Sequence, residues 1–117
     1  MTDIERKALR EFTEEIKSLY GQALKYVILY GSRARGDSRD DSDYDIMILV
    51  DLSEKEIRLL DETLTKLECR YLDDYDMFLT SYTKNINFFN KWVRAHPFYN
   101  NVWNEGVPLY DGEKAAG

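Results

Sequence analysis

Apolar residues near the start of the chain recur every three or four positions, which is the period of one face of a helix. The positions with this spacing are Ile4, Ala8, Phe12, Ile16 and Leu19. They predict an amphipathic helix over residues 3 to 20. Thr2 or Asp3 offers a side-chain oxygen to cap the start of this helix, and Gly21 suits its end.

Two short apolar runs follow, and both have the residue types typical of strands. Residues 24 to 30 are rich in aromatic and branched side chains and predict a first strand. Residues 44 to 50 predict a second strand, which is apolar on both faces from Ile46 onward, as expected of a central strand. The polar segment between them, residues 31 to 42, contains two glycines and predicts a loop.

A second helix and a third strand are expected in the middle of the chain. Ser53 and Glu56 have the spacing of a capping box, and apolar residues continue behind them at helical spacing, so we expect a helix over residues 53 to 68. Residues 75 to 80 predict a third strand. Because the helix is a crossover connection, this strand should run parallel to the strand at residues 44 to 50.

The last third of the chain is aromatic and again helical in pattern. Pro97 ends one predicted helix and starts a short second one that Gly106 can end, and residues 107 to 110 predict a last edge strand. The aromatic positions are Phe88, Phe89, Trp92, Phe98, Tyr99 and Trp103. We expect them mostly in the core, with part of the group available for a partner surface.

The element order predicts a small α/β (α+β) fold, a mixed sheet of three to four strands flanked by helices, in a single domain over residues 1–117. The apolar content of 44% is enough for one hydrophobic core. The net charge of −6 argues against non-specific binding along a nucleic-acid backbone. It does not exclude a single nucleotide, because a divalent cation held by carboxylates reverses the local field.

Three features of the sequence indicate a cytoplasmic protein. The chain contains no run of eighteen apolar residues, so we expect no membrane span. Residues 1 to 5 lack the basic-then-apolar pattern of a secretion signal. Cys69 is the only cysteine and cannot form an internal disulfide, which agrees with a reducing compartment.

The most informative motif joins the first two predicted strands. Gly31 and Ser32 follow the first strand, and after ten intervening residues Asp43 and Asp45 open the second. If the two strands pair as antiparallel neighbours, these four residues meet at one edge of the sheet. Two carboxylates that are two positions apart on a strand leave the same face. Their mutual repulsion is relieved by a cation, and Mg²⁺ prefers such carboxylates together with phosphate oxygens.

A third acidic residue should join this edge from the start of the third strand. The candidates are Asp73, Asp74 and Asp76. We favour Asp76, because we expect it within the strand at residues 75 to 80. Asp74 shares its parity and remains the alternative, while Asp73 is expected in a loop.

The loop between the strands also offers groups for phosphate. Gly31 permits close approach of the backbone, and Ser32 offers a hydroxyl and an amide at a possible helical turn. Arg33, Arg35 and Arg39 can reach triphosphate oxygens. Equally, each arginine could be a solvated cation beside the loop aspartates.

The segment from Gly31 to Asp45 closely resembles the minimal nucleotidyltransferases of prokaryotes, which belong to the polymerase-beta-like superfamily. The resemblance extends over roughly residues 10 to 110. It implies that Asp43 and Asp45 are the metal-binding pair and that Asp76 is the third carboxylate, with two Mg²⁺ ions per site. Gly31 and Ser32, with Arg33 and Arg35, would then bind the nucleotide.

The resemblance also implies a partner and a role. Members of the family act as antitoxins of HEPN-domain RNase toxins that are commonly encoded beside them. By that similarity, the chain would transfer AMP from ATP to a tyrosine hydroxyl of such a toxin (AMPylation) in a type VII-like toxin–antitoxin system. Two other readings stay open: transfer of a nucleotide to a small-molecule hydroxyl, and a non-catalytic antitoxin that blocks its toxin sterically.

Overall fold

The first helix, α1 (Asp3–Tyr20), begins and ends at the residues that the sequence predicts. The Thr2 side chain accepts a hydrogen bond from the Glu5 amide, and the Glu5 side chain accepts one from the Thr2 amide. This capping box satisfies two amides that would otherwise lack partners at the helix start. Our description covers residues 1–113 of a computed structural model.

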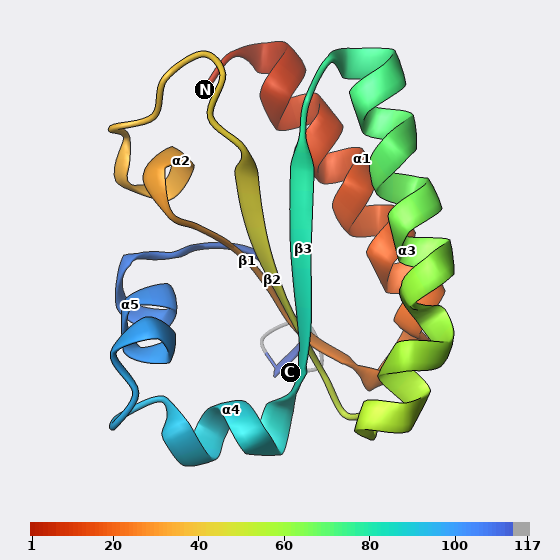
Figure 1. Ribbon diagram of the computed structural model, residues 1–117, viewed down its shortest axis with the longest axis vertical. Helices are drawn as coiled ribbons and strands as arrows, with labels where there is room; N and C mark the ends of the chain where they lie inside the picture. Colours follow the sequence, from red (N-terminus) through yellow and green to blue (C-terminus); the bar gives the residue numbers. More distant parts are fainter. Residues whose placement is uncertain (114–117) are drawn as a thin grey trace.

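Four strands form one mixed sheet in the order β3-β2-β1-β4 (Figure 1). Their bounds are β1 (Leu24–Tyr30), β2 (Tyr44–Val50), β3 (Leu79–Asn85) and β4 (Val107–Asp111). β1 is antiparallel to both β2 and β4, and β2 is parallel to β3. The central place of β2, the hairpin with β1 and the parallel crossover to β3 confirm the predicted topology.

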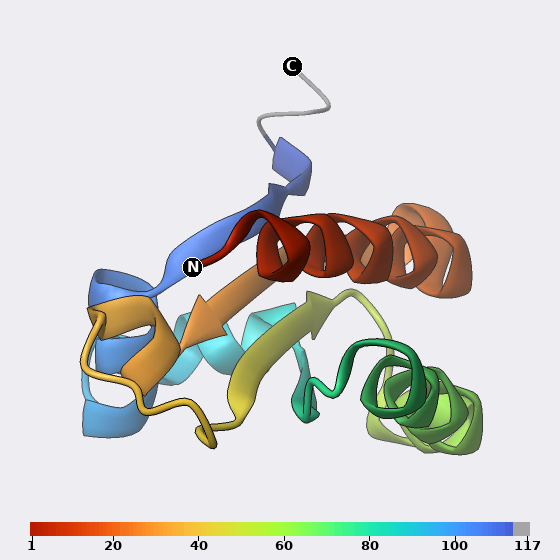
Figure 2. The ribbon, with the colours of Figure 1, turned by 90° about the horizontal axis from the view of Figure 1, so that it is seen from above.

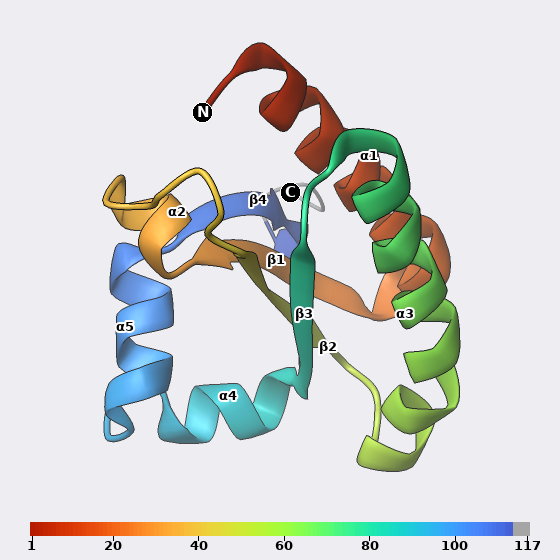
Figure 3. The same ribbon diagram turned by 45° about the horizontal axis from the view of Figure 1, so that its top comes forward.

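Helices cover both faces of this sheet (Figures 1 and 3). α1 and α3 (Glu54–Tyr75) lie on one face, and α4 (Ile86–Trp92) and α5 (Pro97–Glu105) lie on the other. A 3₁₀ turn, η1 (Gly21–Ala23), joins α1 to β1. Within residues 1–113, no helix has the length and apolar content needed to cross a membrane.

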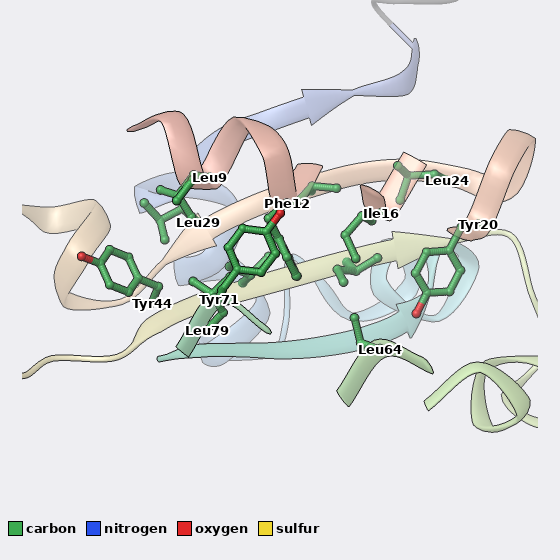
Figure 4. Packing of buried hydrophobic residues seen from close by; sticks show 14 of the residues in the cluster. Leu9, Phe12, Ile16, Tyr20, Leu24, Leu29, Tyr44, Leu64, Tyr71 and Leu79 are labelled. Atoms are coloured by element: carbon green, nitrogen blue, oxygen red, sulfur yellow. The ribbon is translucent and has the colours of Figure 1, made fainter. Parts of the chain in front are cut away.

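The core is divided between these two faces, and β2 contributes to both. Ile46 and Ile48 pack toward α1 and α3, whereas Met47 and Leu49 pack toward α4 and α5. This explains why β2 has no alternation of polar and apolar residues. Figure 4 shows the larger cluster, in which the Phe12 ring of α1 meets the Tyr71 ring of α3 edge-on at 5.4 Å.

The boundary between α3 and β3 differs from the prediction. The capping box at Ser53 is confirmed, but α3 continues to Tyr75 instead of ending at residue 68. The reason is that Tyr71 and Tyr75 continue the apolar stripe of the helix at a spacing of four, and Tyr71 is buried there. β3 therefore begins at Leu79 rather than at residue 75.

The loop at residues 31 to 42 also differs, because it contains a short helix, α2 (Ser32–Arg35). Gly31 precedes it with φ +75° and Gly36 ends it with φ +85°. Both values favour glycine. The last predicted elements are confirmed, since α5 begins at Pro97 and β4 pairs along the edge of the sheet.

Candidate active site

One end of the sheet brings the end of β1, α2 and the start of β2 together with the start of β3, which comes much later in the sequence. Figure 2 views the molecule from this end, where β1 stops, α2 follows, and β2 starts. Tyr30, the last residue of β1, pairs with Asp45 of β2. On the other side of β2, Asp45 pairs with Thr80 of β3. The motif residues therefore meet at one edge, as the hairpin prediction required.

Gly31 and Asp45 are in direct contact at this edge. A Cβ atom added to Gly31 would lie 2.6 Å from Oδ2 of Asp45, too close for any real side chain. The positive φ of Gly31 turns the chain from β1 into α2 at the same point. The glycine thus serves two purposes: it permits the turn, and it leaves room for the Asp45 carboxylate against the backbone.

Asp43 and Asp45 form a pair of neighbouring negative charges. Asp43 is exposed, while Asp45 is half-buried. Burial raises the pKa of the Asp45 carboxyl, and the charge of Asp43 raises it further. Such a pair is relieved by a proton or a cation. Two carboxylates at an accessible edge therefore fit one Mg²⁺ ion that also binds phosphate oxygens.

Asp76 does not lie in a strand, so that expectation is wrong. It is the exposed residue that ends α3, with φ +54°, and its amide donates to the Leu72 carbonyl at 3.0 Å. Asp73 and Asp74 both lie in α3, so the expectation of a loop at Asp73 is wrong as well. The helix includes Asp73 and Asp74 because its apolar stripe extends to Tyr75.

Thr80 occupies the β3 position that faces Asp45. Among residues 1–113, no three His, Cys, Asp or Glu side chains lie close enough together to hold a metal ion. The pair of Asp43 and Asp45 fits a divalent cation, but the predicted cluster of three carboxylates is not formed. The role of Asp76 as the third carboxylate stays a prediction.

Arg33 is held by the loop that carries Asp43. Its Nη2 donates to the Ser42 carbonyl at 2.9 Å and to the Asp40 carbonyl at 3.2 Å. Its Nη1 lies 3.4 Å from Oε2 of Glu5, and its guanidinium lies 4.2 Å from the centre of the Tyr44 ring. The side chain is mostly buried. These contacts orient Arg33 toward the loop and toward α1.

Glu5 and Tyr44 complete this support, which sequence reasoning missed. The Tyr44 hydroxyl donates to Glu5, and this hydrogen bond is the main reason why the pKa of Glu5 falls to about 2. Burial, and then Glu5, raises the pKa of Tyr44 to about 12. Tyr44 lies between Asp43 and Asp45 in the chain, so its anchoring to α1 fixes the segment that carries both acids. The alternation of strand side chains could have indicated it, since Tyr44 must point away from its acidic neighbours.

The other candidate phosphate ligands lie on or near α2. Ser32 is its first residue and is partly exposed. Arg35 is exposed, with Nε 3.3 Å from Oδ2 of Asp37 and Nη1 3.8 Å from Oε2 of Glu105. Exposed ion pairs of this kind are weak, so the Arg35 side chain can turn toward a bound anion. Arg39 is exposed in the following loop.

Comparison with known proteins gives a consistent family. The family described as Polymerase beta, Nucleotidyltransferase matches residues 14–114. "Putative protein adenylyltransferase MJ0604" of Methanocaldococcus jannaschii is 36% identical over 106 residues, which are 91% of this chain and 98% of that protein. "Putative protein adenylyltransferase MJ0141" of the same organism is 38% identical over 103 residues, which are 86% of this chain and 94% of that protein.

Two solved structures share the fold. A chain from a crystal structure of a toxin-antitoxin with AMP-PNP has a TM-score of 0.55 at 15% identity. A chain from a mutant of the toxin-antitoxin MntA-HpeT has a TM-score of 0.54 at 14% identity. In each case the match covers 91% of this chain and 76% of the other. At such identities the likeness concerns the fold.

Proposed function

The chain belongs to the polymerase beta nucleotidyltransferase family and is a nucleotidyltransferase, and on this premise we propose that it transfers AMP from ATP to a hydroxyl group of a partner protein. The observation that carries the proposal is the contact between Gly31 and the Asp45 carboxylate. It joins the Gly-Ser end of β1 to the Asp-x-Asp start of β2 in one site. The two relatives described as protein adenylyltransferases support AMP and a protein acceptor.

Each residue of the site has a proposed part in the reaction. Asp43 and Asp45 would hold Mg²⁺, which supplies positive charge for the triphosphate and for the entering and leaving oxygens. Ser32 and the start of α2 would orient the phosphates, and Arg35 would stabilise the charge of the departing pyrophosphate. Arg33 is predicted as a nucleotide ligand, but its side chain is mostly buried and bonded to the Ser42 and Asp40 carbonyls, so its proposed part is to hold the loop of Asp43.

The second Mg²⁺ ion of the expected pair depends on a third carboxylate. We keep Asp76 in this role, with Asp74 as the alternative, although neither is part of a three-acid cluster in the described structure. A carboxylate there would also accept the proton of the attacking hydroxyl.

We place the reaction in a toxin–antitoxin pair in the cytoplasm. The partner would be a HEPN-domain RNase toxin that is encoded nearby, and the acceptor would be one of its tyrosines. Support comes from the resemblance of the motif region and from the two toxin-antitoxin structures that share the fold. The net charge of −6 is consistent with a protein acceptor rather than an extended nucleic acid.

A transfer assay tests the proposal. The protein is mixed with Mg²⁺, one α-labelled nucleoside triphosphate at a time, and the product of the adjacent reading frame, and label and intact mass are followed on that product. We expect label from ATP with the wild type and none with Asp45→Asn. Asp41→Asn, which removes one exposed charge from the same loop, should keep transfer.

The remaining outcomes distinguish the alternatives. Transfer by Asp45→Asn at the wild-type rate would refute the site. Silencing of the toxin by a complex that carries no label would favour steric inhibition. Label on a small hydroxylated compound, with none on protein, would favour a small-molecule acceptor.

A further inference from the structure

Three aromatic side chains gather on the side of the sheet that α4 and α5 cover, which is also the side from which the Asp45 side chain leaves β2. Tyr30 is the partner of Asp45 on β1. Tyr82 lies two positions beyond Thr80, which faces Asp45 on β3, so Tyr82 and Thr80 leave the same face of the sheet. Phe98 approaches from the first turn of α5. We call Tyr30, Tyr82 and Phe98 the aromatic group.

The three rings are in contact. The Phe98 ring meets the Tyr30 ring edge-on, with centroids 5.6 Å apart and an interplanar angle of 84°. It also meets the Tyr82 ring, with centroids 6.4 Å apart and an angle of 77°. Phe98 thus bridges β1 and β3 above the strand that carries Asp45.

The aromatic group continues directly from the acidic site. Burial, and then the nearby charges of Asp45 and Tyr82, raise the pKa of Tyr30 to about 12. The cross-strand pairing and this electrostatic contact both place the Tyr30 side chain beside the Asp45 carboxylate. A ligand that is bound at Asp45 therefore lies next to aromatic carbon.

Phe98 packs against the buried Tyr99 ring at 5.4 Å, and Lys84 Nζ lies 5.2 Å from the centre of the Tyr82 ring, yet both rings remain partly exposed. Phe98 is 39% exposed and Tyr82 is 42% exposed, whereas Phe89 and Tyr99 on the same side are buried. Exposed aromatic rings bind the faces of nucleobases, and such stacking contributes about 1–3 kcal/mol per base. The nucleoside of a bound triphosphate extends away from its phosphates, so a base beside Asp45 needs a surface of this kind.

We propose that Phe98 and Tyr82 form the stacking surface for the base of the nucleotide whose triphosphate lies at Asp43 and Asp45. This inference deepens the proposed function and rests on it. It also specifies the kind of recognition: the aromatic rings select for a base without distinguishing one base from another, because every base has a π-face. Discrimination among nucleoside triphosphates at this surface is accordingly weak.

The test compares a nucleotide with a phosphate chain that has no base. Binding of MgATP, MgCTP and magnesium tripolyphosphate to the full chain is measured by calorimetry. Phe98→Ala should weaken the binding of MgATP and MgCTP by about 5- to 150-fold, the range that corresponds to the loss of one stacking contact. It should leave magnesium tripolyphosphate unchanged, and Phe98→Trp should restore nucleotide affinity.

The matched control is Phe88→Ala. Phe88 is 42% exposed, like Tyr82, and its ring meets the Tyr99 ring edge-on. It lies on α4, which follows the C-terminal end of β3, whereas Asp45 pairs near the N-terminal end of that strand. This variant should bind all three ligands like the wild type. Melting temperatures check that each variant folds. If Phe98→Ala does not fold, Tyr82→Leu replaces it, and we expect this variant to lose affinity for the nucleotides but not for tripolyphosphate.

Other results would overturn the inference in distinguishable ways. If Phe98→Ala weakens the binding of tripolyphosphate and MgATP equally, Phe98 contributes to phosphate binding or to general stability instead of base binding. Unchanged MgATP affinity combined with slower transfer to the partner would make the aromatic group a surface for the acceptor protein. A wild-type chain that binds neither MgATP nor tripolyphosphate would refute the proposed function itself.

Discussion

At the scale of single residues, a few contacts hold the two aspartates of the site in place. The Asp45 carboxylate lies where a side chain at position 31 would be, and Gly31 has φ +75°. Tyr44, between the two aspartates, donates to Glu5 of α1, and Arg33 is held by the loop that leads to Asp43. These contacts hold Asp43 and Asp45 in position through residues that do not bind the substrate. Substitutions of those residues should therefore still affect the reaction.

The contact of Gly31 predicts a specific loss. We expect Gly31→Ala to abolish nucleotide transfer, because the new Cβ displaces the Asp45 carboxylate. Gly36→Ala is the control, since Gly36 also has a positive φ but has nothing within 4 Å of an added Cβ. It should destabilise by about 1–2 kcal/mol from backbone strain alone and keep its activity. Urea unfolding and the transfer assay measure both effects, and full activity of Gly31→Ala would refute this role.

At the scale of secondary structure, the connection between α3 and β3 decides the third carboxylate. Tyrosine is enriched in strands, so the sequence predicts the start of a strand at residue 75. Burial of Tyr71 against α1 favours the helix instead. As a consequence, Asp76 ends a helix in the left-handed conformation rather than standing in β3.

Substitutions at Asp76 can separate catalysis from helix termination. Asparagine adopts the left-handed conformation readily, so Asp76→Asn should keep the fold. If Asp76 is the third carboxylate, this variant should reduce the rate of transfer by about 10²-fold or more. Asp74→Asn, an exposed change in the last turn of α3, should transfer normally. A normal rate for Asp76→Asn would show that Asp43 and Asp45 suffice, and a loss with Asp74→Asn would move the role there.

At the scale of the complete chain, the fold places Asp43 and Asp45 together at one end of a sheet that helices cover on both faces. The chain has a net charge of −6, and the half-buried Asp45 lies next to Asp43 with a raised pKa. A carboxyl group whose pKa is raised by folding destabilises the folded state when the pH is high enough to ionise it, that is, above the raised pKa. A bound cation reverses this effect.

Stability should therefore depend on Mg²⁺ in the wild type. At a free concentration 100-fold above the dissociation constant, the ion should add about 2.7 kcal/mol to the free energy of unfolding. Asp45→Asn should be at least as stable as the wild type in chelator, because the repulsion is lost, and should gain nothing from Mg²⁺. Asp41→Asn should respond like the wild type. Thermal unfolding with and without Mg²⁺ measures the difference, and equal stabilisation of Asp45→Asn would contradict a metal site at this pair.

Elements whose signals are local follow from the amino-acid pattern alone. The period of apolar residues, the capping box at Ser53 and the run of apolar positions in β2 predict α1, β1, β2 and the start of α3, and the structure confirms them. The spacing from Gly31 and Ser32 to Asp43 and Asp45 predicts that they meet at one edge, because a hairpin requires it. The crossover likewise predicts the parallel pairing of β3.

Features that depend on contacts between distant segments were visible only in the folded chain. The end of α3 depends on the packing of Tyr71 against Phe12, which lies in another helix. The orientation of Arg33 depends on Glu5, and the aromatic group joins β1, β3 and α5. A sequence pattern records what a residue prefers along its own segment, whereas these arrangements depend on which side chain of another segment competes for the same space.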